Sequence, residues 1–412
     1  MIAVSIGSLD LTKFLINKGA DVNARNINKK TALMIASEKG YLDIVKLLIQ
    51  EKGRLDLKDR YGRKAWNFAA DNEHLKLVEF LSKKEINNQS NLFYAVSHGL
   101  YGVVKVLLNL NVNTEVFDDE GWTPLMWAAN NNLTNIVQIL LEKGALLNGS
   151  NGTGSTFSGW TPLMLASGGG HLETVKTLVN NGADLGVKDN DKWTALTWAS
   201  LNGNTDVVSF LINKGSQIDS LTSDDATPLI WASSKGHENV VKNLLDKGAN
   251  IKLKDIHGKT ALAHAVLQGH FSTARLLIKK GANINQNLLY ASKRGYKEMV
   301  NFLLKENAEI DYISSKNETA LELAFKGKHT QTAKLLLSRG ANTSLKNSQG
   351  QTSLMNAVLT GKIGLVKLLL NDSKKFPIDL PQINSVDFFG NTPLMTSATH
   401  GYLDIVNLLI GL

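Results

Sequence analysis

Histidines, glycines and serines are the residues of this chain whose spacing could support metal binding or catalysis. Two histidines on one face of a helix can hold zinc when they are spaced H-x-x-x-H, as in H-E-x-x-H. None of the nine histidines has a partner at that spacing. The run Gly168-Gly169-Gly170 neither follows a predicted strand nor precedes Lys-Ser/Thr, so it is not a phosphate loop. No G-x-S-x-G occurs either. We therefore predict no catalytic residue, no metal, no cofactor and no small-molecule substrate.

Composition narrows the class of protein further. The 412 residues are 43% hydrophobic, which is enough to bury a core, and contain no cysteine. Disulfides and thiolate metal sites are thereby excluded, which is consistent with a reducing compartment. No apolar run approaches the roughly 18 residues of a membrane span. The start of the chain lacks the basic region and small-residue cleavage site of a signal peptide. We expect a cytoplasmic protein, or one delivered into a host cell.

The net charge of +8 is unevenly distributed. Residues 119–255 carry 10 basic and 14 acidic side chains, a net charge of −4, whereas residues 256–412 carry 18 and 10, a net charge of +8. A basic surface can bind nucleic acid or an anionic membrane, but it can also be a solvated lysine surface.

The elements that would position any site come from an internal repeat. Gly-Trp-Thr-Pro-Leu-Met occurs at Gly121–Met126 and again at Gly159–Met164. Related Thr-(Pro/Ala/Ser)-Leu steps begin at Thr31, Thr194, Thr227, Thr260, Thr319, Thr352 and Thr392, and many of these steps are 33 residues apart. Such a period indicates a stack of identical supersecondary units.

Each unit contains the signals of two short helices. Thr123 is placed to cap a first helix with its hydroxyl, and Pro124 follows at the first helical position, where a missing N–H costs nothing. Small alanines allow neighbouring helices to approach. Glycines at two fixed positions end the helices in a left-handed conformation. They are Gly170, Gly203, Gly236 and Gly269 after first helices, and Gly19, Gly144, Gly182, Gly215, Gly248, Gly281 and Gly340 after second helices.

The 33-residue period and the T-P-L-H-x-A-like motif resemble the ankyrin-repeat family over the whole chain. The resemblance implies an all-α solenoid of stacked helix pairs with protruding hairpin loops, in one continuous array over residues 1–412. It places His74, His171, His237 and His270 in the structural Gly-His position of the family, and Asp118, Asp119 and Asp189 at its hairpin turns. We count thirteen units, of which the two at the ends are partial.

Two units depart from the period because they are 26 residues long. They lie near 87–118 and 283–314, and the seven missing residues are those of the hairpin, so we expect two gaps in the row of hairpins. The units lie 196 residues apart, and each ends its second helix with an asparagine (Asn111, Asn307) in place of glycine. We infer that a six-repeat block was duplicated.

Two insertions and the two ends also depart from the pattern. The Gly/Ser/Asn-rich segment 148–158 is predicted to be disordered without a partner. A second insertion spans 371–385. Both ends are apolar where a terminal repeat should be polar, so we expect the chain to continue, or an end to be covered by another chain or by self-association. The apolar residues are Ile2, Val4, Ile6, Leu403, Val406, Leu409 and Ile410.

The position four residues after each Thr is the most informative for binding. Helical spacing predicts that it is only half buried, and the resemblance implies that it lines a concave groove. It is occupied by Ile35, Phe68, Tyr94, Trp127, Leu165, Trp198, Trp231, His264, Tyr290, Leu323, Asn356 and Thr396. These side chains either pack only on neighbouring first helices or, where aromatic, anchor a partner, since aromatic residues dominate binding hot spots.

A second aromatic set, Trp122, Trp160 and Trp193, precedes Thr on three successive hairpins. It could brace the hairpins or contact a partner. The resemblance implies a protein-interaction scaffold that binds a protein or peptide through its groove and hairpin tips. Two rivals remain: a targeting array of a longer effector, channel or enzyme, and a binder of nucleic acid or another anionic surface through the basic C-terminal part.

Overall fold

The structure is a computed structural model that describes residues 1–85, 88–149, 159–371 and 383–411. Its regular elements are helices, and the described residues form thirteen helix pairs. The helices are α1 (Ile2–Ser5), α2 (Leu9–Asn17), α3 (Ala32–Glu38), α4 (Leu42–Gln50), α5 (Ala65–Asp71), α6 (Leu75–Lys84), α7 (Gln89–Ser97), α8 (Tyr101–Asn109), α9 (Pro124–Asn130), α10 (Thr134–Glu142), α11 (Pro162–Gly168), α12 (Leu172–Asn180), α13 (Ala195–Leu201), α14 (Thr205–Asn213), α15 (Pro228–Lys235), α16 (Glu238–Asp246), α17 (Ala261–Gln268), α18 (Phe271–Lys279), α19 (Asn285–Arg294), α20 (Lys297–Lys305), α21 (Ala320–Lys326), α22 (Thr330–Ser338), α23 (Ser353–Leu359), α24 (Ile363–Asn371), α26 (Pro393–Thr399) and α27 (Leu403–Ile410).

The first helix of each pair starts where the capping signal predicts. At α9 the Thr123 hydroxyl accepts a hydrogen bond from Met126 N at 3.2 Å, and Pro124 occupies the first helical position. The cap satisfies an amide that would otherwise lack a partner. The same side-chain cap is present at Thr31, Thr161, Thr227, Thr260, Thr319 and Thr392. The predicted capping role is therefore confirmed at these threonines, whereas the Thr352 side chain makes no capping hydrogen bond at α23.

The helix ends also agree with the sequence. Gly236 follows α15 with a φ of 75°, and Gly248 follows α16 with a φ of 94°. The two asparagines that replace glycine after α8 and α20 also have a positive φ, 56° at Asn111 and 67° at Asn307. Asparagine tolerates this conformation better than other non-glycine residues.

Stacking buries what one pair cannot. Val240, Val241 and Leu244 of α16 are buried, and α16 packs both on α15 and on α18 of the next pair. Each fully buried aliphatic side chain contributes about 1.5–3 kcal/mol relative to an exposed one. α15 in turn packs on α17 through small residues such as Ala232. Each pair is thus stabilised mainly by its neighbours.

The histidine that opens a second helix ties one repeat to the previous one. His270 Nε2 lies 3.1 Å from the carbonyl oxygen of Ser234, at the end of the preceding first helix. His74, His171, His237 and His329 make the same contact with Glu38, Asn130, Leu201 and Lys293. The structural role predicted for His74, His171, His237 and His270 is confirmed, and His329 shares it. In the described residues no three His, Cys, Asp or Glu side chains are grouped so that they could hold a metal ion.

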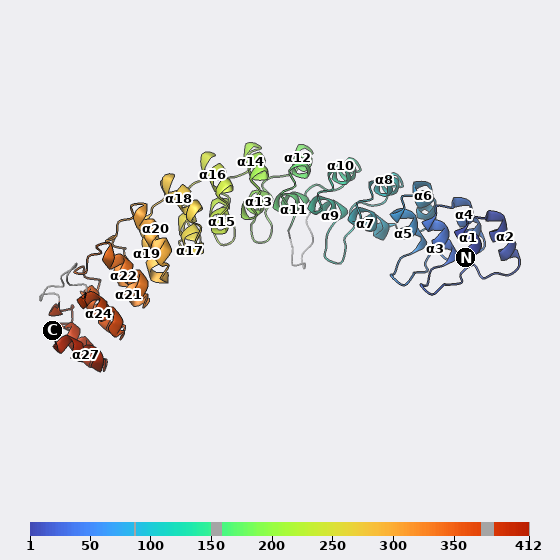
Figure 1. Ribbon diagram of the computed structural model, residues 1–412. Helices are drawn as coiled ribbons and strands as arrows, with labels where there is room; N and C mark the ends of the chain where they lie inside the picture. Colours follow the sequence, from blue (N-terminus) through green and yellow to red (C-terminus); the bar gives the residue numbers. More distant parts are fainter. Residues whose placement is uncertain (86–87, 150–158, 372–382, 412) are drawn as a thin grey trace. The chain divides into compact units, whose positions relative to one another are not determined.

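Contacts divide the array into two compact units. The N-terminal unit comprises Met1–Ala199 and Asp206–Gln217, and the C-terminal unit comprises Ser200–Thr205 and Ile218–Leu412. Within the N-terminal unit, Figure 1 shows α4, α6, α8, α10 and α12 along one edge, while the loops between repeats project on the side of the first helices. Among the described helices, none is long and apolar enough to span a bilayer.

The short repeats lack their hairpins, as predicted. Only residues 280–284 separate α18 from α19, whereas residues 247–260 separate α16 from α17. Most of the two predicted insertions, residues 150–158 and 372–382, lies outside the described residues. The disorder of 148–158 stays a prediction.

The terminal pairs are more complete than expected. α26 and α27 form a whole final pair, and only α1 is shortened, to four residues. Val4 and Leu409, which were expected at exposed faces, are buried, so that expectation is wrong for both. Other predicted apolar residues are exposed: Ile2 by 80%, Ile6 by 64%, Leu403 by 69% and Ile410 by 67%.

We predict that Gly236→Ala destabilises α15 and α17 more than Gly248→Ala destabilises its own surroundings. Both positions have a positive φ, so both changes carry a left-handed backbone cost of about 1–2 kcal/mol. Only at Gly236 would the added Cβ lie 2.6 Å from His270 Nδ1, whereas nothing lies within 4 Å at Gly248. This overpacking should add about 1–3 kcal/mol. Amide hydrogen exchange reports the local free energy of opening.

A double variant, Gly236→Ala/His270→Ala, separates the clash from the backbone strain. Removing the ring should recover most of the extra loss, relative to the sum of the two single changes. Equal losses in the two glycine variants would show that the ring moves aside freely.

Candidate functional site

The hairpins are closed by an acidic side chain at their base. Asp118 Oδ1 accepts hydrogen bonds from the amides of Glu120 at 3.0 Å and Trp122 at 2.7 Å. The same two amide contacts recur at Asp59, Asp189, Asp255 and Asp387, and with an amide oxygen at Asn26 and Asn347. The turn role predicted for Asp118 and Asp189 is confirmed, and Asp119 lies at the tip beside Asp118.

The second oxygen of three of these aspartates binds a ring nine residues later. Trp127 Nε1 donates to Asp118 Oδ2 at 2.6 Å, and Trp198 Nε1 donates to Asp189 Oδ2 at 3.1 Å. His264 Nε2 lies 2.8 Å from Asp255 Oδ2. A ring on the first helix is thus fixed by the hairpin of its own repeat. Its orientation is set before any partner arrives, so less side-chain entropy is lost on binding.

Equivalent aspartates differ in acidity because their partners differ. Burial raises the pKa of Asp189 above its usual value, although the Trp193 amide and the neutral Trp198 indole donate to it. Burial also acts on Asp255, but there the Lys259 amide and the His264 ring outweigh it and lower the pKa. A ring that can carry positive charge favours the ionised carboxylate more than an indole does.

The aromatic residues of three repeats gather into one cluster in the N-terminal unit. The ring centroids of Trp122 and Trp127 lie 5.6 Å apart, and those of Trp160 and Trp198 lie 4.7 Å apart. Trp193 also packs on Trp198, at 4.7 Å. Trp160 packs against the core formed by Trp122, Met126 and Leu165, which joins the two groups. We call Trp122, Trp127, Trp160, Trp193 and Trp198 the tryptophan cluster.

The cluster unites two sets of residues that the sequence analysis kept apart. Trp127 and Trp198 belong to the predicted column on the first helices, whereas Trp122, Trp160 and Trp193 precede the hairpin threonines. Trp122 is buried, and the other four are half buried. The structure therefore supports bracing of the hairpins for all five, and leaves part of four rings on the surface.

Two other predicted residues lie elsewhere in the N-terminal unit. Phe68 is only 2% exposed, because Lys30 Nζ and Arg63 Cζ lie 4.5 and 4.4 Å from its ring centre. The half burial expected there is wrong, and it is also wrong for Leu165, Leu323 and Asn356, which are buried. Tyr94 is half buried, and its hydroxyl donates to Asp71 Oδ1 at 2.5 Å. Burial and this hydrogen bond raise the pKa of Tyr94.

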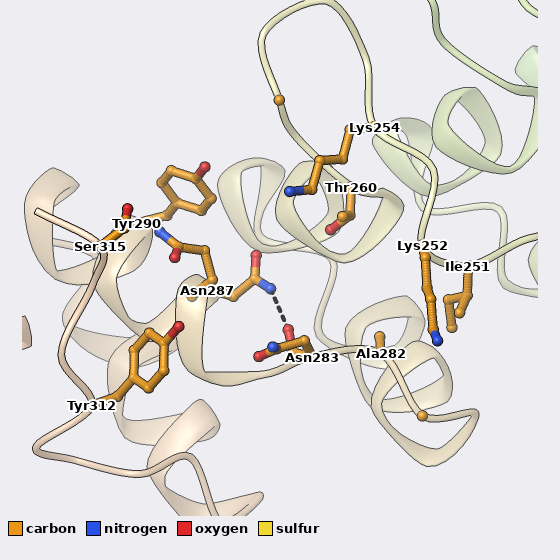
Figure 2. Close-up of a pocket in the computed structure, with 13 residues that line it drawn as sticks. Ile251, Lys252, Lys254, Thr260, Ala282, Asn283, Asn287, Tyr290, Tyr312 and Ser315 are labelled. Carbon is orange, nitrogen blue, oxygen red and sulfur yellow. Dashed lines mark hydrogen bonds between the residues drawn. The ribbon is translucent and has the colours of Figure 1, made fainter.

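In the C-terminal unit the predicted residues border two separate cavities. Trp231 and His264 line a cavity of about 190 Å³, together with Asp224 and Asp255. Tyr290 lines another cavity, of about 570 Å³, at the missing hairpin of the short repeat. Figure 2 shows Tyr290 and Tyr312 on one side of this cavity and Lys252 and Lys254 on the other.

A family model for ankyrin repeats, described as "Ankyrin repeats (3 copies)", matches successive stretches that together cover the chain. They are residues 1–91, 82–151, 144–222, 215–287, 288–379 and 340–412. The chain belongs to the ankyrin-repeat family. Ankyrin repeats are a general protein-interaction module, so an ankyrin array of this length implies protein partners.

Individual relatives share parts of this ankyrin array. The chain is 32% identical over 90 residues to "Ankyrin repeat and KH domain-containing protein mask-1" of Caenorhabditis elegans, which is 22% of this chain and 3% of the relative. It is 33% identical over 125 residues to "Putative ankyrin repeat protein FPV031" of Fowlpox virus, covering 30% and 36%.

A third relative has an enzyme's name. The chain is 32% identical over 127 residues to "Glycerophosphocholine phosphodiesterase GDE1" of Candida albicans, covering 30% of this chain and 10% of the relative. The aligned segments thus span between 3% and 36% of the three relatives.

The gap cavities are the functional candidates that the sequence analysis missed. The second one lies in the N-terminal unit, has about 480 Å³, and is lined by Phe93, Phe117, Glu115 and Asp119 among others. The 26-residue length of the two short repeats was the signal for both. It shows that a hairpin is missing, but not which side chains of the flanking hairpins face the gap.

We predict that Asp255→Asn costs more stability at pH 7 than Asp189→Asn. The lowered pKa of Asp255 stabilises the fold above the unfolded value of about 3.9, and this contribution is lost as pH falls through the folded pKa. The raised pKa of Asp189 has the opposite sign, because ionisation of that carboxyl opposes folding as pH rises. Both variants lose the Oδ2 acceptor of a ring nitrogen, and losing a hydrogen bond to a charged group costs about 1.5–3 kcal/mol, but at Asp189 this cost is offset because a charged group no longer has to be buried.

Amide exchange of the two hairpins at pH 7 and near pH 4 measures both effects. Each asparagine keeps the Oδ1 acceptor that closes its turn, so the two variants are matched. If Asp189→Asn loses more stability than Asp255→Asn at pH 7, the opposite pKa shifts given to the two aspartates are wrong.

Proposed function

We propose that this ankyrin array is a non-catalytic scaffold that binds a protein or peptide through its first-helix face and hairpins, with the tryptophan cluster as the main anchor in the N-terminal unit. The observation that carries the proposal is the pair of indoles held by hairpin carboxylates, Trp127 on Asp118 and Trp198 on Asp189. Large rings of fixed orientation, half buried at the surface, are the residues that dominate binding hot spots.

The charge around the cluster indicates the chemistry of its ligand. Residues 119–255 carry a net charge of −4, and several acidic side chains on these hairpins are exposed, including Asp119, Glu120 and Asp191. A basic segment with apolar side chains complements both the rings and the charge. Trp231 occupies the corresponding position in the C-terminal unit, where it faces its own cavity beside Asp224 and Asp255.

The relatives support a second candidate function, in which the array is one part of a longer protein. Each is longer than the segment it shares with this chain, and one is named as a phosphodiesterase. An ankyrin array can deliver such a neighbouring domain to its target. We therefore propose, as the alternative, that this array is the targeting part of a longer protein. The nucleic-acid alternative rests on charge alone, through the +8 of residues 256–412.

We predict that Trp198→Ala weakens binding of a basic, apolar peptide by about 2 kcal/mol or more, close to 30-fold in Kd, the usual scale of a hot spot. The ligand would be selected from a displayed peptide library with the intact chain as bait. Trp198→Phe keeps an aromatic surface but loses the N–H donated to Asp189, so it should weaken binding less. Titration calorimetry at several salt concentrations measures both.

Two controls separate anchoring from folding. Asp189→Asn keeps both rings and the turn, and should cost less affinity than Trp198→Ala. Phe68→Leu changes an aromatic side chain that is buried under Lys30 and Arg63, and should leave affinity unchanged. If Trp127→Ala, Trp198→Ala and Trp231→Ala all fold and bind the selected peptide as tightly as the unmodified chain, these rings serve packing alone.

A further inference from the structure

Three pairs of neighbouring hairpins are joined at their tips by a backbone hydrogen bond. The amide of Ile256 donates to the carbonyl of Asp224 at 2.9 Å, from one hairpin to the previous one. The same bond joins Arg60 to Asn28 at 3.0 Å and Phe388 to Gln349 at 3.0 Å. In these three pairs the later hairpin donates an amide and the earlier one accepts with a carbonyl, whereas the consecutive hairpins 314–318 and 347–351 lack this bond.

At the short repeat α19–α20 the hairpin that could make such bonds is missing. In each of these bonds the second residue of one hairpin donates to the third residue of the previous hairpin. A hairpin between 255–259 and 314–318 would therefore bind the carbonyl of His257 and the amide of Ser315. Both residues are exposed, and within the described ranges neither group makes a backbone hydrogen bond to another hairpin. Lys254 and Thr260 beside the gap form an antiparallel β-bridge, so this hairpin has a strand-like edge. Such an edge can pair with an added extended segment.

The space left by the missing hairpin is the cavity of about 570 Å³. Its wall on one side carries Lys252 and Lys254, and its wall on the other carries Tyr312 and Ser315 (Figure 2). Both lysines are exposed, and neither forms an ion pair with another described residue. The described lining includes no acidic side chain. Ammonium groups and phenol hydroxyls facing one space favour a ligand with carboxylates.

The floor of the cavity is polar where other repeats are apolar. Asn287 stands at the position that Pro or Ala occupies in most repeats, and it is 2% exposed. Its Nδ2 donates to the Asn283 carbonyl at 2.8 Å, whereas its Oδ1 has no hydrogen-bond partner among the described residues. In Figure 2 that oxygen points away from Asn283, toward the side of Thr260. A buried acceptor without a donor is destabilising, and a donor from a bound segment would satisfy it after a small shift of the lining side chains.

The equivalent gap in the N-terminal unit has the opposite charge. It is lined by Glu115, Asp118 and Asp119, together with Phe93 and Phe117. The two gaps therefore share the absence of a hairpin but not the chemistry of their walls.

We propose that the gap between hairpins 255–259 and 314–318 is a docking site for an extended acidic segment of a partner protein, which takes the place of the missing hairpin. Its backbone pairs with the His257 carbonyl and the Ser315 amide, and its carboxylates contact Lys252 and Lys254. This site goes beyond the proposed function above, because it uses a different surface and a ligand of opposite charge.

The test uses the intact chain and two capped ten-residue peptides, one alternating Glu and Thr and the other alternating Lys and Thr. Amide NMR titration follows the resonances of Ser315, His257 and Tyr290. The Glu peptide should shift these resonances, and the Lys peptide should not. Lys252→Glu/Lys254→Glu should weaken binding of the Glu peptide at least tenfold. The charge-matched variant Lys297→Glu/Lys334→Glu, at exposed positions on α20 and α22, should change it less than threefold.

Backbone pairing is tested with a Glu peptide that is N-methylated at its central residues. It keeps every carboxylate but loses amide donors, and should bind at least fivefold more weakly. Trp198→Ala should leave Glu-peptide binding unchanged, so this site and the tryptophan cluster can fail independently. The proposal is overturned if the peptide shifts resonances across the whole basic surface and is insensitive to Lys252→Glu/Lys254→Glu. It is also overturned if a single-stranded oligonucleotide binds the gap more tightly than the peptide.

Discussion

The structure depends on one constraint: a pair of helices of four to ten residues cannot bury its own apolar faces. α16 shows how the constraint is met, because Val240, Val241 and Leu244 are covered partly by α15 and partly by α18 of the next pair. Everything else in a repeat acts on that interface. The histidine bond between His270 and the Ser234 carbonyl sets the spacing of adjacent pairs, and Gly236 leaves room for the ring. Stability is then a sum over the repeats and the interfaces between neighbouring repeats.

The hairpin carboxylates fix the orientation of side chains at the surface of the stack. One oxygen of Asp118 closes the turn, and the other holds Trp127 on the first helix. A side chain that would otherwise sample several rotamers is fixed by its own repeat. Replacing the indole by imidazole at His264 keeps the geometry but changes the acidity of Asp255. The same scaffold can therefore present rings of different chemistry without any change of backbone, which suits a module whose partners vary between proteins.

The limits of prediction from the sequence follow from which interactions are local. The Thr123 cap, the left-handed Gly236 and the left-handed Asn307 depend on a few adjacent residues, and all three were predictable. The burial of Phe68 was not, because it depends on Lys30 and Arg63. Lys30 belongs to the preceding repeat. The 33-residue period predicts where its backbone lies, but not which rotamer its side chain adopts. For the same reason Trp160 and Trp198 could not be assigned to one cluster before the structure showed their rings in contact.

The two gaps illustrate what a solenoid permits when a local element is lost. Because each pair is stabilised by its neighbours, deleting a hairpin leaves the helices stacked and exposes the walls of the adjacent hairpins. Those walls are then free to differ. The two short repeats are 196 residues apart in the sequence. At that spacing Ser315 is equivalent to Asp119, and Lys252 is equivalent to Asp56. Asp56 is paired with Arg54 through contacts of 3.0 and 2.6 Å, whereas Lys252 faces the cavity. The two gaps thus differ in electrostatics, a difference that packing does not require, since both gaps lie outside the helix interfaces.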